Sequence, residues 1–337
     1  MRVLFIWEVR EELRNYLLAH LLKSKSMEFI FLTKDELEMA AIERPEDIQV
    51  TVGWVVQRPF WDKIFRQLTH LQLIIHPAVG VDKAIPFVQS LHSNHKITLC
   101  NSFGHTYFTA QHAVGMLLTL CNRLLLHHHA MKVGKWRTGE KDGKSLPMKY
   151  RKTGLLGYGS INQRVHRFLE GFDTEIHVLK NTLTEAQQTD PHFYTQDQLH
   201  DFLAAVDNLI LAVPLTEKTN GMIGEKELEL LGASGILVNV ARGEVVQEKP
   251  FYEALKTGKI FAAASDVWYD YRPEADEEGR KFPYTYPFHE LENVLLSPHR
   301  GGSPLDDLER WGQTMEILSR FERKEELMNV INWERGY

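Results

Sequence analysis

Two residues with useful chemistry directly follow hydrophobic segments of this sequence. Arg242 comes after the segment 235–240, and His299 comes after the segment 294–296. Both segments are predicted strands, and open α/β sheets bind ligands at the carboxyl ends of their strands. An arginine offers paired donors to the oxygens of a 2-oxo acid, and a histidine can protonate its carbonyl as a hydride arrives. Each type also occurs in purely structural roles, as an ion-paired arginine or a hydrogen-bonded core histidine.

A turn with the sequence Gly-Tyr-Gly-Ser-Ile-Asn, at residues 157–162, is typical of loops that bind a dinucleotide. The first glycine makes the turn, the second lets the backbone approach the pyrophosphate, and the third lets helix and strand pack closely. Gly157 and Gly159 fill two positions, but Asn162 stands at the third, so we expect the helix to stand slightly off the sheet. A predicted strand before the turn and an amphipathic helix after it favour a dinucleotide site over a plain strand–helix turn.

The type of dinucleotide depends on the end of the next predicted strand, 175–179. An acidic residue there would bind the ribose hydroxyls of NAD. The sequence instead continues Lys180-Asn181-Thr182. A cation suits the 2′-phosphate of NADP, so we favour NADP over NAD; the alternative is that Lys180 is a solvated lysine at a strand end.

Short hydrophobic runs alternate with helical segments, which is typical of parallel sheets covered by helices. The pattern predicts an α/β fold with two doubly wound parallel sheets, the second larger than the first. The predicted strands are 3–7, 29–32, 50–55 and 71–75 in the first sheet, and 153–156, 175–179, 208–213, 235–240, 261–267 and 294–296 in the second.

Two other segments are predicted from their composition. Residues 109–134 show helical spacing of hydrophobic residues and carry His127-His128-His129. Adjacent helix residues do not share a face, so we interpret these histidines as a solvated or interface face, not a metal site. Residues 269–287 are polar, aromatic and proline-bearing, and we expect a long loop that serves a site or an interface.

The overall composition excludes several classes of protein. The chain has 337 residues, 43% hydrophobic and 25% charged, which is ordinary for about two globular domains. A net charge of −6 argues against binding nucleic acid or anionic membranes. Two cysteines are too few for a disulfide framework or a zinc site, and we expect no metal. No hydrophobic run reaches the length of a signal-peptide core or a membrane span, so we expect a soluble cytoplasmic protein.

The motifs taken together resemble the D-isomer-specific 2-hydroxyacid dehydrogenase family. Each motif alone is modest, but the ordered set at the family's spacing is specific, and it covers residues 71–332; residues 1–70 match only as a pattern of strands and helices. The motifs are 76–82 (HPAVGVD), 111–113 (QHA), 133–136 (VGKW), the glycine turn, 214–216 (PLT), 239–243 (NVARG), 265–268 (SDVW) and 297–299 (SPH).

The resemblance implies a role for each matching residue. It makes Arg242 the substrate-orienting arginine and His299 the general acid/base. The remaining implied positions are Val79 and Gly80 with backbone amides at the substrate carboxylate, Ser160 and Ile161 at the pyrophosphate, Pro214 and Thr219 along the cofactor, and Val240 and Asp266 at the nicotinamide.

The resemblance also implies the domain organisation. A flavodoxin-like substrate domain, discontinuous over 1–103 and 305–337, would flank a Rossmann-like NAD(P)-binding domain over 104–304. A homodimer is expected, with the helix 109–134 as its arm.

The sequence departs from the family pattern in the catalytic set. The family has a glutamate that holds the histidine and raises its pKa, but Tyr271 stands at that position. Glu274 could replace it after a local rearrangement, or the acid is missing, which would lower the pH at which reduction falls off. Gln111, where the family usually has glutamate, is a smaller departure.

Two functions of different classes are compatible with these residues. The first is an NAD(P)-dependent reductase of a small 2-oxo acid to the D-2-hydroxy acid, with a formate- or phosphite-type dehydrogenase as a lesser alternative. The second is a cofactor-sensing binding protein that kept the scaffold and lost the chemistry, which the missing glutamate and Asn162 would suit. The retained Arg242 and His299 favour the enzyme.

Overall fold

The chain folds into two compact units, and each is described by itself. The computed structural model describes residues 1–21, 27–55, 59–91, 96–137, 143–304 and 307–337. The first unit consists of Met1–His105 together with Pro304–Tyr337, and the second is continuous over Thr106–Ser303. The second unit therefore interrupts the first in the sequence.

The first unit contains a parallel five-stranded sheet in the order β2-β1-β3-β4-β5. Its strands are β1 (Arg2–Phe5), β2 (Glu28–Phe31), β3 (Ile48–Val52), β4 (Leu73–His76) and β5 (Thr98–Asn101). Its helices are α1 (Glu11–Leu21), α2 (Lys34–Met39), α3 (Pro59–Phe65), α4 (Ala84–Leu91) and α12 (Gly312–Arg323).

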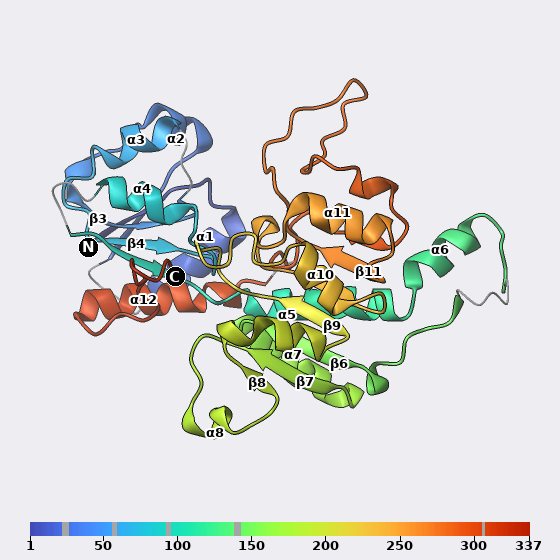
Figure 1. The fold of residues 1–337 in the computed structure, drawn as a ribbon. Helices are drawn as coiled ribbons and strands as arrows, with labels where there is room; N and C mark the ends of the chain where they lie inside the picture. Colours follow the sequence, from blue (N-terminus) through green and yellow to red (C-terminus); the bar gives the residue numbers. More distant parts are fainter. Residues whose placement is uncertain (22–26, 56–58, 92–95, 138–142, 305–306) are drawn as a thin grey trace. The chain divides into compact units, whose positions relative to one another are not determined.

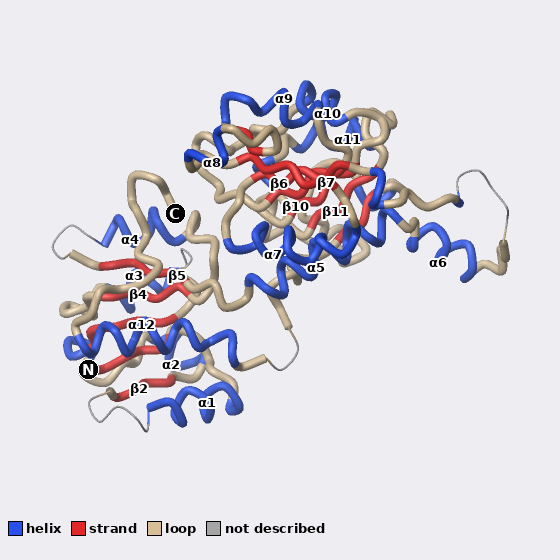
Figure 2. Tube along the Cα trace, turned by 90° about the horizontal axis from the view of Figure 1, so that it is seen from below, coloured by secondary structure: helices blue, strands red, loops and turns tan. Residues whose placement is uncertain are grey.

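Neighbouring residues of these strands enter different hydrophobic clusters because side chains alternate across a sheet. Leu4 and Ile74 pack with side chains of α2, α3 and α4. Val3 and Ile75 pack with side chains of α1 and α12. The sheet is thus covered on both faces, with α2, α3 and α4 on one side and α12 on the other (Figure 1), and Figure 2 looks onto the face that α12 covers.

The second unit contains a parallel seven-stranded sheet in the order β12-β11-β10-β9-β6-β7-β8 (Figure 1). Its strands are β6 (Lys152–Leu156), β7 (Glu175–Leu179), β8 (Phe193–Tyr194), β9 (Asn208–Leu211), β10 (Ile236–Asn239), β11 (Ala262–Ser265) and β12 (Val294–Leu296). Its helices are α5 (Thr106–Cys121), α6 (Leu124–Lys132), α7 (Ser160–Leu169), α8 (Glu185–Gln188), α9 (Leu199–Ala204), α10 (Glu225–Leu231) and α11 (Glu248–Lys256).

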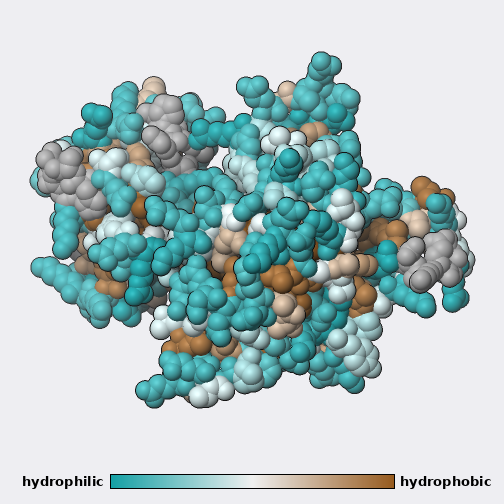
Figure 3. Space-filling model, viewed as in Figure 1, coloured by the Kyte–Doolittle hydropathy of each residue, from teal (hydrophilic) through white to brown (hydrophobic). Residues whose placement is uncertain are grey.

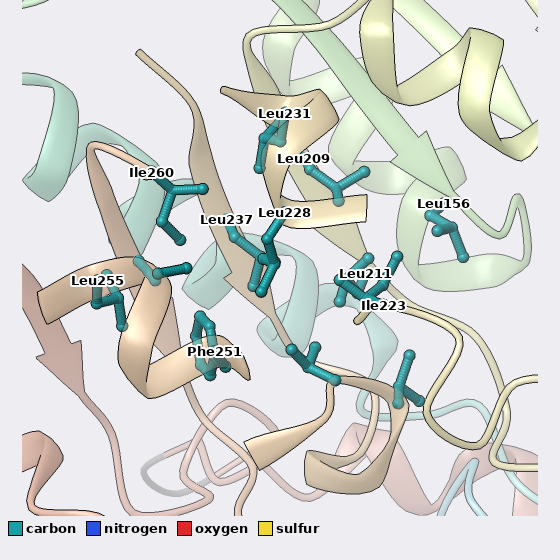
Figure 4. Close-up of a cluster of buried hydrophobic side chains, with 14 of the residues drawn as sticks. Leu156, Leu209, Leu211, Ile223, Leu228, Leu231, Leu237, Phe251, Leu255 and Ile260 are labelled. Atoms are coloured by element: carbon teal, nitrogen blue, oxygen red, sulfur yellow. The ribbon is translucent and has the colours of Figure 1, made fainter. Parts of the chain in front are cut away.

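Hydrophobic clusters on both faces hold this sheet. One joins the strands to α5 and α7. The other joins them to α9, α10 and α11, and Figure 4 shows Leu209 and Leu237 of the strands packed with Leu228 of α10 and Phe251 of α11. The strand order reverses between β6 and β9: from β6 the sheet continues through β7 and β8 in one direction, and from β9 through β10, β11 and β12 in the other. Such a switch point is where open α/β sheets bind ligands.

The predicted fold class is confirmed, and three details differ. The helix predicted over 109–134 is two helices, because Arg123 has φ +55° and a left-handed residue cannot continue a right-handed helix. Strands β5 and β8 were not predicted. Residues 269–287 contain no helix or strand, as predicted. Within the described parts of the chain, no helix has the length and hydrophobicity needed to span a bilayer.

Candidate active site

The glycine turn lies at the switch point of the second sheet, between the end of β6 and the start of α7. Gly157 has φ +83°, and a Cβ there would lie 2.7 Å from Val213 Cγ1 and 2.8 Å from Ala212 O. Only glycine fits that conformation and space. Gly159 caps α7 and has no atom within 4 Å of a Cβ position. The turn therefore presents open space beside the first amides of α7, those of Ser160 and Ile161, which have no partner within the helix.

Asn162 ties the turn to the sheet. Its side chain is fully buried, and Nδ2 donates to the carbonyl oxygens of Gly157 at 2.7 Å and Leu156 at 3.2 Å. From the sequence we expected Asn162 only to hold the helix slightly away from the sheet. The structure shows an amide that satisfies carbonyls at the end of β6 and so fixes the shape of the turn.

Lys180 follows β7 and is half-buried. Its Nζ lies 3.3 Å from Gln187 Oε1 in the short helix α8. A capping box between Thr184 and Gln187 begins α8, so the acceptor of the lysine is itself held in place. The ammonium group is thereby positioned at the carboxyl end of β7.

Pro214 and Thr219 lie in the loop after β9. Thr219 Oγ1 donates to Pro214 O at 2.6 Å and accepts a hydrogen bond from Thr216 N at 2.8 Å. Thr219 thus closes the loop at its base, while Pro214 is exposed.

Arg242 follows β10 in a backbone that is held from two sides. Asn239 donates through Nδ2 to Arg242 O at 2.9 Å and accepts from Ala241 N at 3.0 Å. A Cβ on Gly243 would lie 2.5 Å from the carbonyl carbon of Trp268, so the backbone after Arg242 contacts the segment after β11. Val240, which precedes this turn, is buried. The arginine is half-buried on a fixed support.

Asp266 holds the turn that carries His299. The carboxylate is 3% exposed and accepts from Ser297 Oγ at 2.5 Å, Arg300 N at 2.7 Å and Gly301 N at 2.8 Å. His299 itself has φ +56°, a conformation that costs energy for a residue with a Cβ. The hydrogen bonds to Asp266 compensate for that cost and fix the backbone around the histidine.

His112 extends this network from α5. Its Nε2 lies 2.9 Å from Ser297 Oγ and 3.6 Å from Asp266 Oδ1. Because the serine hydroxyl donates to the carboxylate, the imidazole Nε2–H donates to the serine. Burial of Asp266 by itself raises its pKa, but the hydrogen bonds from His112, Ser297 and the two amides more than offset it, so the pKa lies below the usual aspartate range.

Tyr271 contacts His299 directly. Its hydroxyl oxygen lies 2.7 Å from His299 Nδ1, and the two rings meet edge to face at 5.4 Å. Burial raises the pKa of Tyr271, and the Trp268 backbone and the charge of Arg242 offset this only in part, so the phenol is protonated at neutral pH. Glu274 is exposed, and no hydrogen bond joins it to His299 among the described residues. A neutral phenol therefore contacts the histidine where the resemblance led us to expect a carboxylate.

Glu244 was missed by the sequence analysis. Its Oε2 is buried and has no hydrogen-bond partner in the described part of the chain, which is a costly arrangement. Its charge is felt at Tyr271, whose pKa it helps to raise. The only available signal was its place two residues after Arg242.

Val79 and Gly80 belong to the first unit and follow β4. Asn101 Nδ2 donates to Val79 O at 2.8 Å, and Ala78 N donates to His76 O at 2.8 Å, which holds the turn. Within the described ranges, the amides of Val79 and Gly80 donate to no protein acceptor. Two adjacent amides of this kind can bind an anion.

The fold and the second unit's site define a class of protein, an α/β oxidoreductase with a dinucleotide turn at the switch point of a parallel sheet. The comparisons with known proteins name the family. Residues 114–301 match the NAD-binding domain of D-isomer-specific 2-hydroxyacid dehydrogenases. The chain belongs to this family, and it is an NAD(P)-dependent dehydrogenase.

Individual relatives agree with this assignment. The chain is 30% identical over 312 residues to a glyoxylate reductase of Korarchaeum cryptofilum, covering 90% of this chain and 89% of the relative. It is 29% identical over 304 residues to a glyoxylate reductase of Pyrococcus furiosus, covering 88% and 82%. Its fold is similar to a D-isomer-specific 2-hydroxyacid dehydrogenase of Xanthobacter autotrophicus Py2, with a TM-score of 0.79 and 20% identity over 100% of this chain and 99% of that one.

Proposed function

We propose that this protein reduces a small 2-oxo acid to the D-2-hydroxy acid, with His299 as the general acid and Arg242 orienting the substrate. The observation that carries the proposal is the fixed support of His299: Asp266 holds its backbone and Tyr271 holds Nδ1. With Nδ1 engaged, the proton passes to the substrate carbonyl from Nε2.

The residues of the glycine turn fit a dinucleotide. Gly157 leaves no room for a side chain, Gly159 leaves space for a ligand, and α7 begins beside that space. When bound, the nicotinamide supplies the hydride. We propose that Lys180 binds the 2′-phosphate of NADP; in support, the Xanthobacter protein of similar fold was solved in complex with NADPH. Pro214, Thr219, Val240 and Asp266 are proposed to line or support the cofactor site.

We propose that the substrate is of the size of glyoxylate or hydroxypyruvate, because relatives are glyoxylate reductases. The amides of Val79 and Gly80 are proposed to bind its carboxylate. The test is oxidation of NADPH and NADH, followed by absorbance with glyoxylate, hydroxypyruvate and bulkier 2-oxo acids. Turnover with one of them is expected, and no turnover with any at high enzyme concentration would overturn the proposal.

The second candidate is a cofactor-sensing binding protein, which the phenol at position 271 favours. His299→Ala distinguishes the two. The enzyme predicts an unchanged affinity for the dinucleotide and a loss of turnover of at least about 100-fold, the usual contribution of a general acid. A wild-type protein that binds NADPH tightly and turns over no substrate supports the sensor.

We also propose a homodimer formed through α6. This helix and the residues after it expose large hydrophobic side chains, and Figure 3 shows hydrophobic atoms over α6 at the right of the view. Burying such side chains against a second copy is favourable. The exposed residues are Leu124 (53%), Leu126 (36%), Met131 (52%), Val133 (71%) and Trp136 (71%). Light scattering is expected to give the mass of two chains, and the variant Met131→Glu/Trp136→Glu the mass of one.

A further inference from the structure

Three residues that bind metals in other proteins meet at the edge of the second sheet. Glu175 and His177 lie two residues apart on β7, so their side chains share a face. His192 directly precedes β8, which pairs in parallel with β7. Nε2 of His177 lies 2.7 Å and Nε2 of His192 lies 3.5 Å from Oε1 of Glu175. All three potential ligand atoms lie within 4.8 Å of one another.

Both imidazoles are oriented by a hydrogen bond on their other nitrogen. Nδ1 of His192 lies 3.0 Å from Asp190 Oδ1, and Nδ1 of His177 lies 3.1 Å from the hydroxyl of Tyr194. Histidines that bind metals usually use the second ring nitrogen in this way, which fixes the ring and the tautomer. Both Nε2 atoms are therefore directed at the carboxylate of Glu175.

We propose that Glu175, His177 and His192 form a binding site for a divalent transition metal, with Zn²⁺ as the best-suited ion. Two imidazole nitrogens and one carboxylate oxygen, completed by water, match its tetrahedral preference. Bonds of about 2.0–2.1 Å place ligand atoms roughly 3.3 Å apart in a tetrahedron. The contact between His177 and Glu175 must open by about half an ångström, while that of His192 already fits.

The site is accessible to solvent, and Glu175 lies at the opposite end of β7 from Lys180. The side chain of His177 is 5% exposed, but those of Glu175 and His192 are 45% and 43% exposed, so an ion can enter from solvent. Glu175 begins β7, whereas Lys180 and the glycine turn lie at the carboxyl ends of their strands. A bound ion would have a structural effect on this unit, and no role in hydride transfer is implied.

That effect concerns β8. This strand has two residues and lies at the edge of the sheet beside β7, with α8 in the connection between them (Figure 1). An ion held by β7 and His192 would fasten the far end of the connection 180–192. Lys180 and its partner Gln187 lie within that connection.

A lysine competes for the same carboxylate. Nζ of Lys152 lies 3.4 Å from Glu175 Oε1, and its side chain is 49% exposed. A metal ion would displace this ammonium group into solvent, where a lysine is readily hydrated. Replacing the lysine with an uncharged residue therefore strengthens metal binding, an effect that an ordinary hydrogen-bonded cluster does not predict.

The experiment uses the full chain with His127, His128 and His129 replaced by glutamine, because those exposed histidines on α6 would bind the same ions. Zn²⁺ is titrated by calorimetry, and Co²⁺ by absorption, whose visible bands report tetrahedral ligands. We expect one ion per chain. At a hundredfold excess over Kd the melting temperature should rise by roughly 5–10 °C.

Variants then locate the site. His192→Ala is expected to abolish binding, and it is a half-exposed residue whose loss should leave the fold intact. His200→Ala is the matched control, since His200 bonds Glu227 at 2.8 Å in the same unit and is not part of the cluster, and it should leave binding unchanged. Lys152→Gln should lower Kd. The proposal is overturned by the absence of saturable binding, by binding that survives His192→Ala, or by a higher Kd in Lys152→Gln.

Discussion

The hydroxyl of Tyr271 lies 2.7 Å from Nδ1 of His299, at the position where the family resemblance led us to expect a glutamate. As partners of the imidazole, a glutamate carboxylate and a tyrosine phenol differ in charge. A carboxylate stabilises the imidazolium, whereas a neutral phenol can donate to the neutral ring or accept from the charged one. Geometry is thus retained while the electrostatic contribution is lost.

This contact predicts the pH profile of Tyr271→Glu. Reduction needs the protonated imidazole, and a carboxylate favours that form, so activity should persist to a pH about 1–2 units higher than in the wild type. Because burial raises the pKa of Tyr271, the phenol keeps its proton over the whole range used and adds no titration of its own. The measurement is kcat/KM for reduction between about pH 5 and 9.

Tyr271→Phe is the matched control for that experiment. It removes the hydroxyl and keeps the ring, so kcat should fall without any shift of the profile to higher pH. A profile of Tyr271→Glu that coincides with the wild type would contradict the assigned role of this contact.

Asp266→Asn should destabilise the second unit and slow turnover. The carboxylate accepts three hydrogen bonds that an amide cannot all replace, and the expected loss is about 1–3 kcal/mol. The pKa of Asp266 is lowered in the folded state, so its contribution is complete above the ordinary aspartate pKa and is lost as the pH falls through the lower, folded value.

Unfolding by urea at pH 7 and at about pH 3 measures this contribution. The difference in the free energy of unfolding between the wild type and Asp266→Asn should be large at pH 7 and smaller at the lower pH. A difference that is equal at both would show that the charge of Asp266 does not stabilise the turn at His299.

The two glycines of the dinucleotide turn should behave differently when each is replaced by alanine. Gly157→Ala places a Cβ against Val213 and Ala212 at positive φ, so it should destabilise the fold by at least about 1–2 kcal/mol. Gly159→Ala meets open space and should fold normally, yet weaken the dinucleotide because that space is where the ligand approaches. Melting temperature and Kd for NADPH separate the two effects; equal losses in both variants would contradict this reading.

Lys180→Ser should weaken NADPH roughly ten- to a hundredfold and leave NADH nearly unchanged, since only the former offers a phosphate to the ammonium group. Lys226→Ser, an exposed lysine on α10, is the control for the loss of a positive charge. The measurement is the Kd for each cofactor by fluorescence titration. An equal loss of affinity for NADPH and NADH would mean that Lys180 does not select NADP.

The sequence predicted the two sheets because buried parallel strands are nearly continuous hydrophobic runs. It did not predict β8, whose two residues become a strand only through pairing with β7. Nor did it predict the break at Arg123, where neither glycine nor proline marks the end of α5. Both features depend on tertiary contacts and not on local propensity.

In the candidate site, too, some residues were predicted from local sequence patterns, whereas others depend on tertiary contacts. Gly157, Arg242 and His299 could be singled out as candidates because their motifs have fixed spacing. The contact of Tyr271 was not predicted, because it lies in a segment without periodicity, where position in the sequence does not fix position in space. Asn162 was considered only for its volume, and the structure adds hydrogen bonds from its amide to two backbone carbonyls.

The discontinuous first unit has a consequence for synthesis of the chain. Strand β5 receives a hydrogen bond from Ile331 N to Leu99 O at 2.9 Å, and α12 covers the hydrophobic face formed by β1, β3 and β4. A ribosome must therefore synthesise residues 307–337 before the first unit can close, whereas the uninterrupted residues 106–303 can fold earlier. Until α12 is in place, the face formed by β1, β3 and β4 is covered by α1 but not by α12, so part of its hydrophobic surface stays open to aggregation while synthesis continues.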